Sequence, residues 1–131
     1  MAYRRRRVLI VDDDVHVRDF LTLALEYEAY EVRGAADGLE ALAVLGEWRA
    51  DVIVLDLMMP EMDGRSFLTE QHRVEGFADI PVLIVSALHD LANRARGLSA
   101  LAVYEKPLAL DDFLDAVRSL IDFRTTDQRG C

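Results

Sequence analysis

The sequence contains a single cysteine, Cys131, at its carboxyl end. One thiol can form neither a disulfide within the chain nor a cysteine-rich metal site, so the composition agrees with a reducing compartment. No apolar run reaches the roughly 18 residues that cross a bilayer, and no signal peptide is recognisable. These absences predict a soluble, cytoplasmic protein without a membrane partner.

Basic charge is also scarce, since 15 lysines and arginines face 24 aspartates and glutamates, for a formal net charge of -9. An acidic surface repels phosphate backbones, so we expect no direct nucleic-acid binding. The arginines at residues 4–7 are interpreted as part of a solvated terminal arm. No Gly-x-Gly-x-x-Gly turn follows the first apolar run, which argues against a nucleotide or flavin site.

Short apolar runs rich in valine and isoleucine alternate with segments whose apolar residues recur every three or four positions. This alternation predicts strands separated by helices, within one domain. Because the runs are apolar on both faces, the strands should form a parallel sheet with helices on both sides. The expected strands lie near residues 8–11, 52–55, 80–85, 101–103 and, more weakly, 30–33.

Capping residues mark the first two helices: Asp14 is predicted to cap one, and Asp37 with Glu40 forms a capping box for the next. A third helix is expected after residues 60–64 and a short fourth near residues 91–98. The last helix should bury Phe113, Leu114, Val117, Leu120 and Ile121. We therefore divide the chain into a basic arm (1–6), one domain (7–123) and an unfolded polar tail or linker stub (124–131).

Reactive side chains directly follow four of the predicted strands, namely Asp12 and Asp13, Asp56, Ser86 and Lys106. In an open sheet of order 2-1-3-4-5, the crevice lies at the carboxyl ends of strands 1 and 3, which brings the three aspartates together. Their mutual repulsion calls for a hard dication such as Mg²⁺. Asp56 would then attack a phosphoryl group, with Lys106 neutralising charge and Ser86 donating a hydrogen bond. Taken alone, Asp12 and Asp13 also fit plain capping of a helix.

Four segments, Val11-Asp12-Asp13, Asp56 to Gly64, Val85-Ser86-Ala87 and Lys106-Pro107, resemble the signatures of response-regulator receiver domains in order and spacing. The resemblance runs from about Arg7 to Phe123. It implies a flavodoxin-like, doubly wound α/β fold with a five-stranded parallel sheet of order 2-1-3-4-5 and five helices. Such domains are the phosphoacceptors of two-component signal transduction.

The same resemblance implies a role for each signature residue. Asp56 would be the phosphoacceptor, and Mg²⁺ would be bound directly by Asp13, by Asp56 and by the backbone carbonyl of Met58. Asp12 would help through water. Lys106 and Ser86 would contact the phosphoryl group, and the peptide between Lys106 and Pro107 would be cis.

Receiver domains take their phosphoryl group from a phosphohistidine, so the implied donor is a sensor histidine kinase or a histidine phosphotransfer protein. The implied surface for a partner, an output domain or a homodimer is the face of the fourth helix, fifth strand and fifth helix. A receiver is not an ordinary enzyme, although it assists its own phosphorylation and dephosphorylation.

One position departs from the family pattern. Receivers usually carry Tyr or Phe three residues before the lysine, where this chain has Val103. Tyr104 lies one residue later, and a shift of one residue in a strand points the side chain to the opposite face unless a bulge intervenes. We therefore expect phosphorylation to persist, with its output carried by the loop around Ser86 and the fourth helix.

Two other functions stay open on the sequence alone. A Mg²⁺-dependent phosphohydrolase also uses an aspartate nucleophile at a strand end, but such enzymes usually carry a second aspartate two residues later, where this chain has Met58. A structural module that has lost phosphorylation would be expected to lack one of the acids or the lysine, and none is missing.

Overall fold

The computed structural model describes residues 5–56, 64–74, 76–86, 102–105 and 109–129. Within this part of the chain the strands form a five-stranded sheet of the predicted order, β2-β1-β3-β4-β5, and every neighbouring pair is parallel. The strands are β1 (Arg7–Val11), β2 (Glu31–Ala35), β3 (Val52–Leu55), β4 (Val82–Ser86) and β5 (Ala102–Glu105). The helices are α1 (Val15–Tyr27), α2 (Gly38–Glu47), α3 (Gly64–Arg73) and α5 (Leu110–Arg129). The fourth helix expected near residues 91–98 lies outside the described residues.

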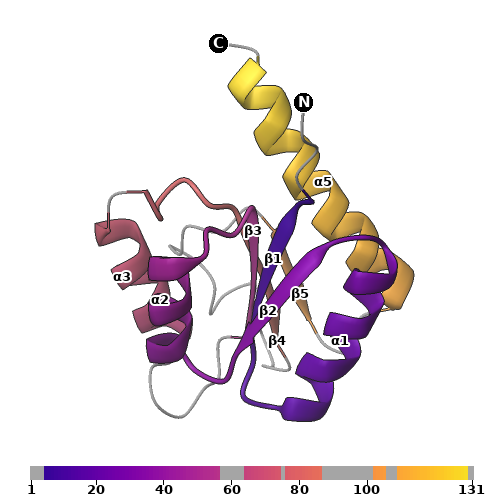
Figure 1. The fold of residues 1–131 in the computed structure, drawn as a ribbon, viewed down its shortest axis with the longest axis horizontal. Helices are drawn as coiled ribbons and strands as arrows, with labels where there is room; N and C mark the ends of the chain where they lie inside the picture. Colours follow the sequence, from indigo (N-terminus) through magenta and orange to yellow (C-terminus); the bar gives the residue numbers. More distant parts are fainter. Residues whose placement is uncertain (1–4, 57–63, 75, 87–101, 106–108, 130–131) are drawn as a thin grey trace.

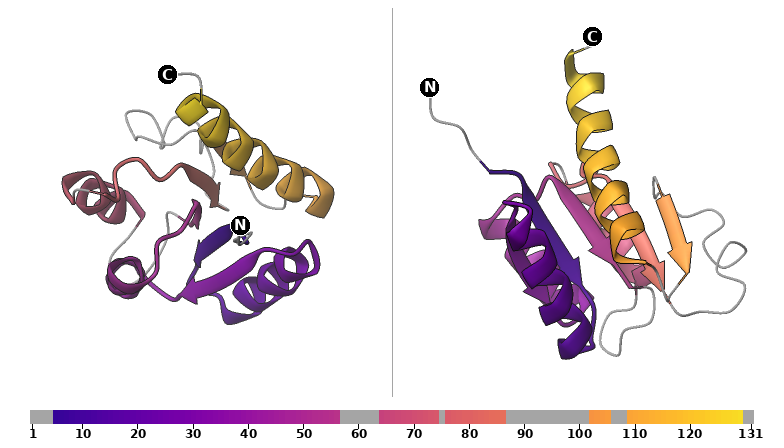
Figure 2. Two further views of the ribbon diagram at one scale, coloured as in Figure 1. Left: turned by 45° about the horizontal axis from the view of Figure 1, so that its top comes forward. Right: turned by 90° about the vertical axis from the view of Figure 1, so that its right-hand side faces the viewer.

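Helices cover both faces of the sheet, with α1 and α5 on one side and α2 and α3 on the other (Figures 1 and 2). Successive strand residues alternate between two buried apolar clusters. Val8 and Ile10 belong to the cluster that contains Phe113 of α5. Leu9 belongs to the cluster that contains Phe67 of α3. The double-sided burial explains why β1, β3 and β4 are continuous apolar runs instead of alternating ones.

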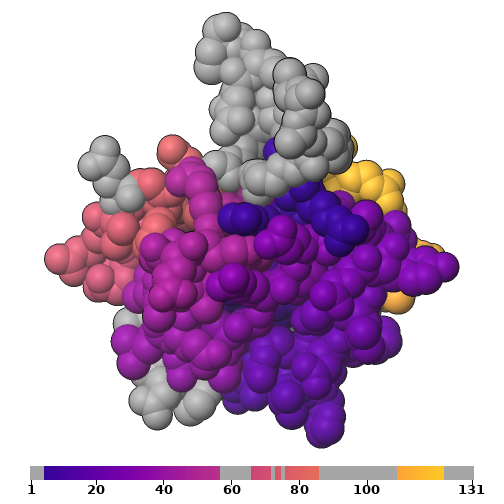
Figure 3. Space-filling model, in the orientation of Figure 1, coloured from indigo at the N-terminus to yellow at the C-terminus, as the bar shows by residue number. Residues whose placement is uncertain are grey.

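The predicted helix caps and the predicted buried face of the last helix are confirmed. Asp14 caps α1 by accepting hydrogen bonds from the backbone N–H of His16 at 2.9 Å and of Val17 at 3.3 Å. Asp37 caps α2 by accepting from the N–H of Glu40 at 2.8 Å. Of the five apolar residues expected inside α5, four are buried and one is partly buried against the same cluster. In the space-filling view, side chains of α1, β2 and α2 make up most of the face toward the viewer (Figure 3).

The polar end of the chain differs from the expectation of an unfolded tail. Helix α5 continues through residues 124–129 and ends at Arg129. Its last turns project beyond the amino-terminal ends of the strands (Figures 1 and 2). The segment contains no proline or glycine before Gly130, so nothing in the sequence interrupts the backbone bonds that extend the helix from its buried part.

The pairing of β5 bears on the position of Tyr104. Its register with β4 is uninterrupted, with Val103 opposite Ile84, Tyr104 opposite Val85 and Glu105 opposite Ser86. The backbone therefore contains no bulge in the described part of β5. The expectation that Tyr104 does not replace the missing aromatic residue at Val103 stays a prediction.

Candidate functional site

Three aspartates meet at the carboxyl ends of β1 and β3. Val11 and Leu55 are paired as the last residues of these strands, and the N–H of Asp56 donates to the carbonyl of Val11 at 2.9 Å. Asp12, Asp13 and Asp56 each place a carboxylate oxygen within 4.8 Å of the others. The predicted crevice of the doubly wound sheet thus brings together the three acids that the sequence indicated.

Burial differs among the three acids. Asp12 and Asp56 are only 4% and 7% exposed, whereas Asp13 is exposed. Two unit charges at 4.8 Å repel by about 3 kcal/mol at an effective dielectric of about 20, and less where solvent screens an exposed group. The cluster therefore carries a local excess of negative charge that a cation would offset.

The chemistry of these donors fits Mg²⁺. All three are hard carboxylate oxygens, and the described residues of the cluster offer neither nitrogen nor sulfur. Mg²⁺ prefers such oxygen ligands and commonly binds through one or two carboxylates while it keeps several waters. Asp13 is exposed, so one of the three carboxylates is open to solvent.

Two hydrogen bonds fix the turn between β1 and α1. The N–H of Asp14 donates to Oδ1 of Asp12 at 2.9 Å, and Nη1 of Arg18 donates to the backbone carbonyl of Asp12 at 2.7 Å. Asp14 itself caps α1, so it serves the helix and is not part of the acid cluster. Arg18 was not predicted from the sequence as a site residue, although its place one helical turn after the cap residue Asp14 is a usable signal.

The other predicted site residues are described only partly or not at all. Ser86 is the last residue of β4, which puts its backbone at the same edge of the sheet as the acids. Strand β5 ends at Glu105, the residue before Lys106 in the sequence. Lys106 and Met58, and with them the predicted cis peptide, lie outside the described residues.

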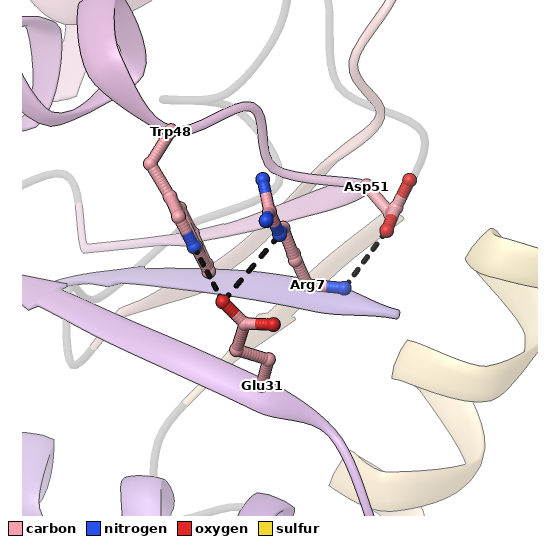
Figure 4. Close-up of polar contacts among 4 residues, drawn as sticks. All are labelled: Arg7, Glu31, Trp48 and Asp51. Atoms are coloured by element: carbon pink, nitrogen blue, oxygen red, sulfur yellow. Dashed lines mark hydrogen bonds and ion pairs between the residues drawn. The ribbon is translucent and has the colours of Figure 1, made fainter. Parts of the chain in front are cut away.

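A second polar cluster, also missed by the sequence analysis, lies at the opposite edge of the sheet (Figure 4). Trp48 is the C-cap residue of α2. It is buried and donates from Nε1 to Oε1 of Glu31 at 2.8 Å. Nε of Arg7 lies 3.5 Å from the same oxygen, and the guanidinium carbons of Arg7 and Arg33 are each 5.3 Å from the centre of a Trp48 ring. The N–H of Arg7 also donates to Asp51 at 2.8 Å. This cluster joins β1, β2 and α2 and so has a structural role.

The Trp48 hydrogen bond lowers the pKa of Glu31 below its ordinary value of 4.5, helped by the charges of Arg7 and Arg33 and opposed by partial burial. A lowered pKa means that the ionised form stabilises the fold above pH 4.5, and that this contribution is lost as the pH falls further. We expect Glu31→Gln to lower the melting temperature at neutral pH, and the difference from the unmodified chain to shrink in acid. Thermal unfolding followed by Trp48 fluorescence measures this, with the exposed Glu26→Gln as a charge control. A difference that stays constant with pH would contradict the expectation.

No helix in the described residues is both long and apolar enough to cross a membrane.

The family model described as "Response regulator receiver domain" matches residues 8–118. Among curated proteins, the chain is 36% identical over 124 residues to the "DNA-binding dual master transcriptional regulator RpaA" of Synechocystis, an alignment that covers 93% of this chain and 51% of that protein. It is 40% identical over 126 residues to the "Response regulator MprA" of a Mycobacterium species (strain KMS), with coverages of 95% and 54%. The chain thus spans about half the length of these relatives.

Solved structures give the same result for the fold. A CheY-like receiver domain protein from Methanospirillum hungatei has a TM-score of 0.87 at 28% identity, with coverage of 95% of this chain and 99% of that one. The chemotaxis protein CheY4 of Vibrio cholerae has a TM-score of 0.83 at 28% identity, with coverages of 89% and 99%. The sheet order, the acid cluster and these matches agree, and the chain therefore belongs to the response regulator receiver domain family, the phosphoacceptor signalling domains of two-component systems.

Proposed function

We propose that Asp56 is the residue that accepts the phosphoryl group and that Asp12, Asp13 and Asp56 hold Mg²⁺ together with the backbone carbonyl of Met58. The observation that carries this proposal is the convergence of three carboxylates within 4.8 Å at the crevice of the sheet. When bound, the ion would neutralise charge on the transferring phosphoryl oxygens. Of the three acids, Asp56 is the preferred nucleophile because it is the one that follows β3, the central strand of the sheet. Its side chain is also buried.

In the proposed reaction a carboxylate oxygen of Asp56 attacks the phosphorus of a phosphohistidine. An O–P bond forms, the P–N bond breaks, and its electron pair stays on the imidazole, which takes up a proton. The Lys106 ammonium would pair with a phosphoryl oxygen and the Ser86 hydroxyl would donate to another, which stabilises the acyl phosphate. The signal would end by hydrolysis, in which water attacks the same phosphorus, the O–P bond to Asp56 breaks, and inorganic phosphate leaves, so that the Asp56 carboxylate is restored.

The donor in this proposal is a sensor histidine kinase or a histidine phosphotransfer protein, and the reaction takes place in the cytoplasm. Both statements rest on family membership. The relative RpaA is named as DNA-binding. By likeness to it we propose that any contact with DNA belongs to an output domain, because this acidic domain repels phosphate. The face of the fourth helix, β5 and α5 would transmit the signal or form a homodimer.

The test is incubation of the folded chain with acetyl phosphate, in Mg²⁺ or in EDTA, followed by intact-mass measurement. We expect one phosphoryl group per chain in Mg²⁺ and none in EDTA. An unmodified mass in Mg²⁺ would contradict the proposal. Sustained multiple turnover of an aryl phosphate, abolished by Asp56→Ala, would instead favour the phosphohydrolase alternative.

A further inference from the structure

Arg18 connects α1 to the end of β1 at the acid cluster. Its Nη1 donates to the backbone carbonyl of Asp12 at 2.7 Å, and its side chain is half-buried. A hydrogen bond from a guanidinium is stronger than one between neutral groups. The acceptor belongs to the residue whose own Oδ1 takes the N–H of Asp14, so the peptide and the carboxylate of Asp12 are both tied to the start of α1.

Gly34 provides the path that the Arg18 side chain follows across β2. A Cβ atom at position 34 would lie 2.9 Å from Cδ of Arg18 and 3.1 Å from its Cγ, closer than such atoms pack. Gly34 sits inside β2, paired with Ile10 of β1. Glycine weakens a strand interior, and its use there commonly marks a close approach of another group. Here the group that approaches is Arg18.

We propose that Arg18 is a positioning residue for the metal site, and that Gly34 is required for that role. By holding the Asp12 carbonyl, Arg18 fixes the turn from which the Asp12 and Asp13 carboxylates face Asp56. This inference rests on the proposed Mg²⁺ site and goes beyond it, because Arg18 is not one of the proposed ligands and acts through the backbone of Asp12.

The direction in which Mg²⁺ affinity changes when Arg18 is replaced separates a positioning role from a purely electrostatic one. Arg18 carries positive charge close to a site for a dication, so its Coulombic effect alone opposes Mg²⁺ binding. If the charge were all that mattered, removal of the guanidinium would tighten Mg²⁺ binding. If Arg18 positions Asp12 and Asp13, its removal weakens Mg²⁺ binding in spite of the lost repulsion.

Two variants disturb Arg18 in different ways. Arg18→Met keeps most of the apolar stem but removes the donor and the charge. Gly34→Ala changes no charge, and its new methyl group would meet Cγ and Cδ of Arg18, so the Arg18 side chain has to shift. If both act through the same contact, the double variant should bind Mg²⁺ no more weakly than Arg18→Met does.

Arg49 offers a matched control. Its Nη1 also donates to a backbone carbonyl, that of Gly76, at the same distance of 2.7 Å. Arg49 lies just before β3, at the opposite edge of the sheet from the acids. Arg49→Met therefore removes a bond of the same type and length, although a more exposed one, and an equal charge far from the cluster.

The experiment is calorimetric titration of each folded variant with Mg²⁺ alone, beside urea unfolding in EDTA. Residues that orient metal ligands typically change affinity by about 10- to 100-fold, so we expect the Kd to rise by at least about tenfold in Arg18→Met. Gly34→Ala should raise the Kd as well, and Arg49→Met should leave it unchanged. Arg18→Lys should restore part of the affinity.

The inference would be overturned if Arg18→Met or Gly34→Ala bound Mg²⁺ as tightly as the Arg49→Met control. That result would leave the proposed function intact. An unmodified chain that binds no Mg²⁺ would overturn the proposed site and this inference together.

Discussion

Asp56→Asn should take up no phosphoryl group from acetyl phosphate in Mg²⁺, because a neutral amide offers no anionic oxygen to attack phosphorus. The substitution preserves the shape of a side chain that is only 7% exposed, so the fold should persist. Intact mass measures the result directly. The loss of modification should be complete.

Asp51→Asn is the matched control for this loss. Asp51 is also 7% exposed, and it immediately precedes β3 whereas Asp56 immediately follows it. An asparagine at position 51 can still accept the N–H of Arg7, now bonded at 2.8 Å. Asp51→Asn should therefore be phosphorylated like the unmodified chain. A full phosphoryl gain in Asp56→Asn would show that another residue, such as the exposed Asp13, is the acceptor.

Asp12→Asn should be more stable than the unmodified chain without metal and less stable than the unmodified chain in saturating Mg²⁺. Its oxygen still accepts the N–H of Asp14, but one charge leaves the cluster. Without metal, relief of repulsion should raise the free energy of unfolding by on the order of 1 kcal/mol. With Mg²⁺ at a hundredfold excess over its Kd, the unmodified chain gains about 2.7 kcal/mol by mass action, and the variant should gain much less.

Urea unfolding in EDTA and in saturating Mg²⁺ measures the free energy of unfolding without metal and the gain that Mg²⁺ adds to it. The control is Asp14→Asn, which removes a charge from the same turn but retains a good helix cap outside the cluster. Asp14→Asn should respond to Mg²⁺ like the unmodified chain. An equal gain from Mg²⁺ in Asp12→Asn would place the ion elsewhere.

The sheet and its acid cluster were predictable because each rests on a local pattern joined to one rule of topology. Short apolar runs of three to six residues marked the strands, and the rule for doubly wound sheets placed Asp12 and Asp56 at one crevice. The caps at Asp14 and Asp37 were also legible, since side-chain oxygens that bond the first N–H groups of a helix act within three residues.

Contacts between distant residues were not predictable from local patterns. Trp48 and Glu31 are 17 residues apart, and only the pairing of β1 with β2 brings Glu31 beside Arg7 and so into that cluster. The close approach of Arg18 to Gly34 depends on where α1 lies over β2, and the sequence of neither segment alone specifies that position. The end of α5 was predicted wrongly because polar composition shows that a segment lacks a buried face, not that a helix must stop there.

The most direct test of the central claim is anomalous diffraction from crystals grown with Mn²⁺ in place of Mg²⁺. We predict one strong metal peak bounded by the carboxylates of Asp12, Asp13 and Asp56, at the carboxyl ends of β1 and β3. A peak at another place on the protein, with none among these three aspartates, would contradict the account.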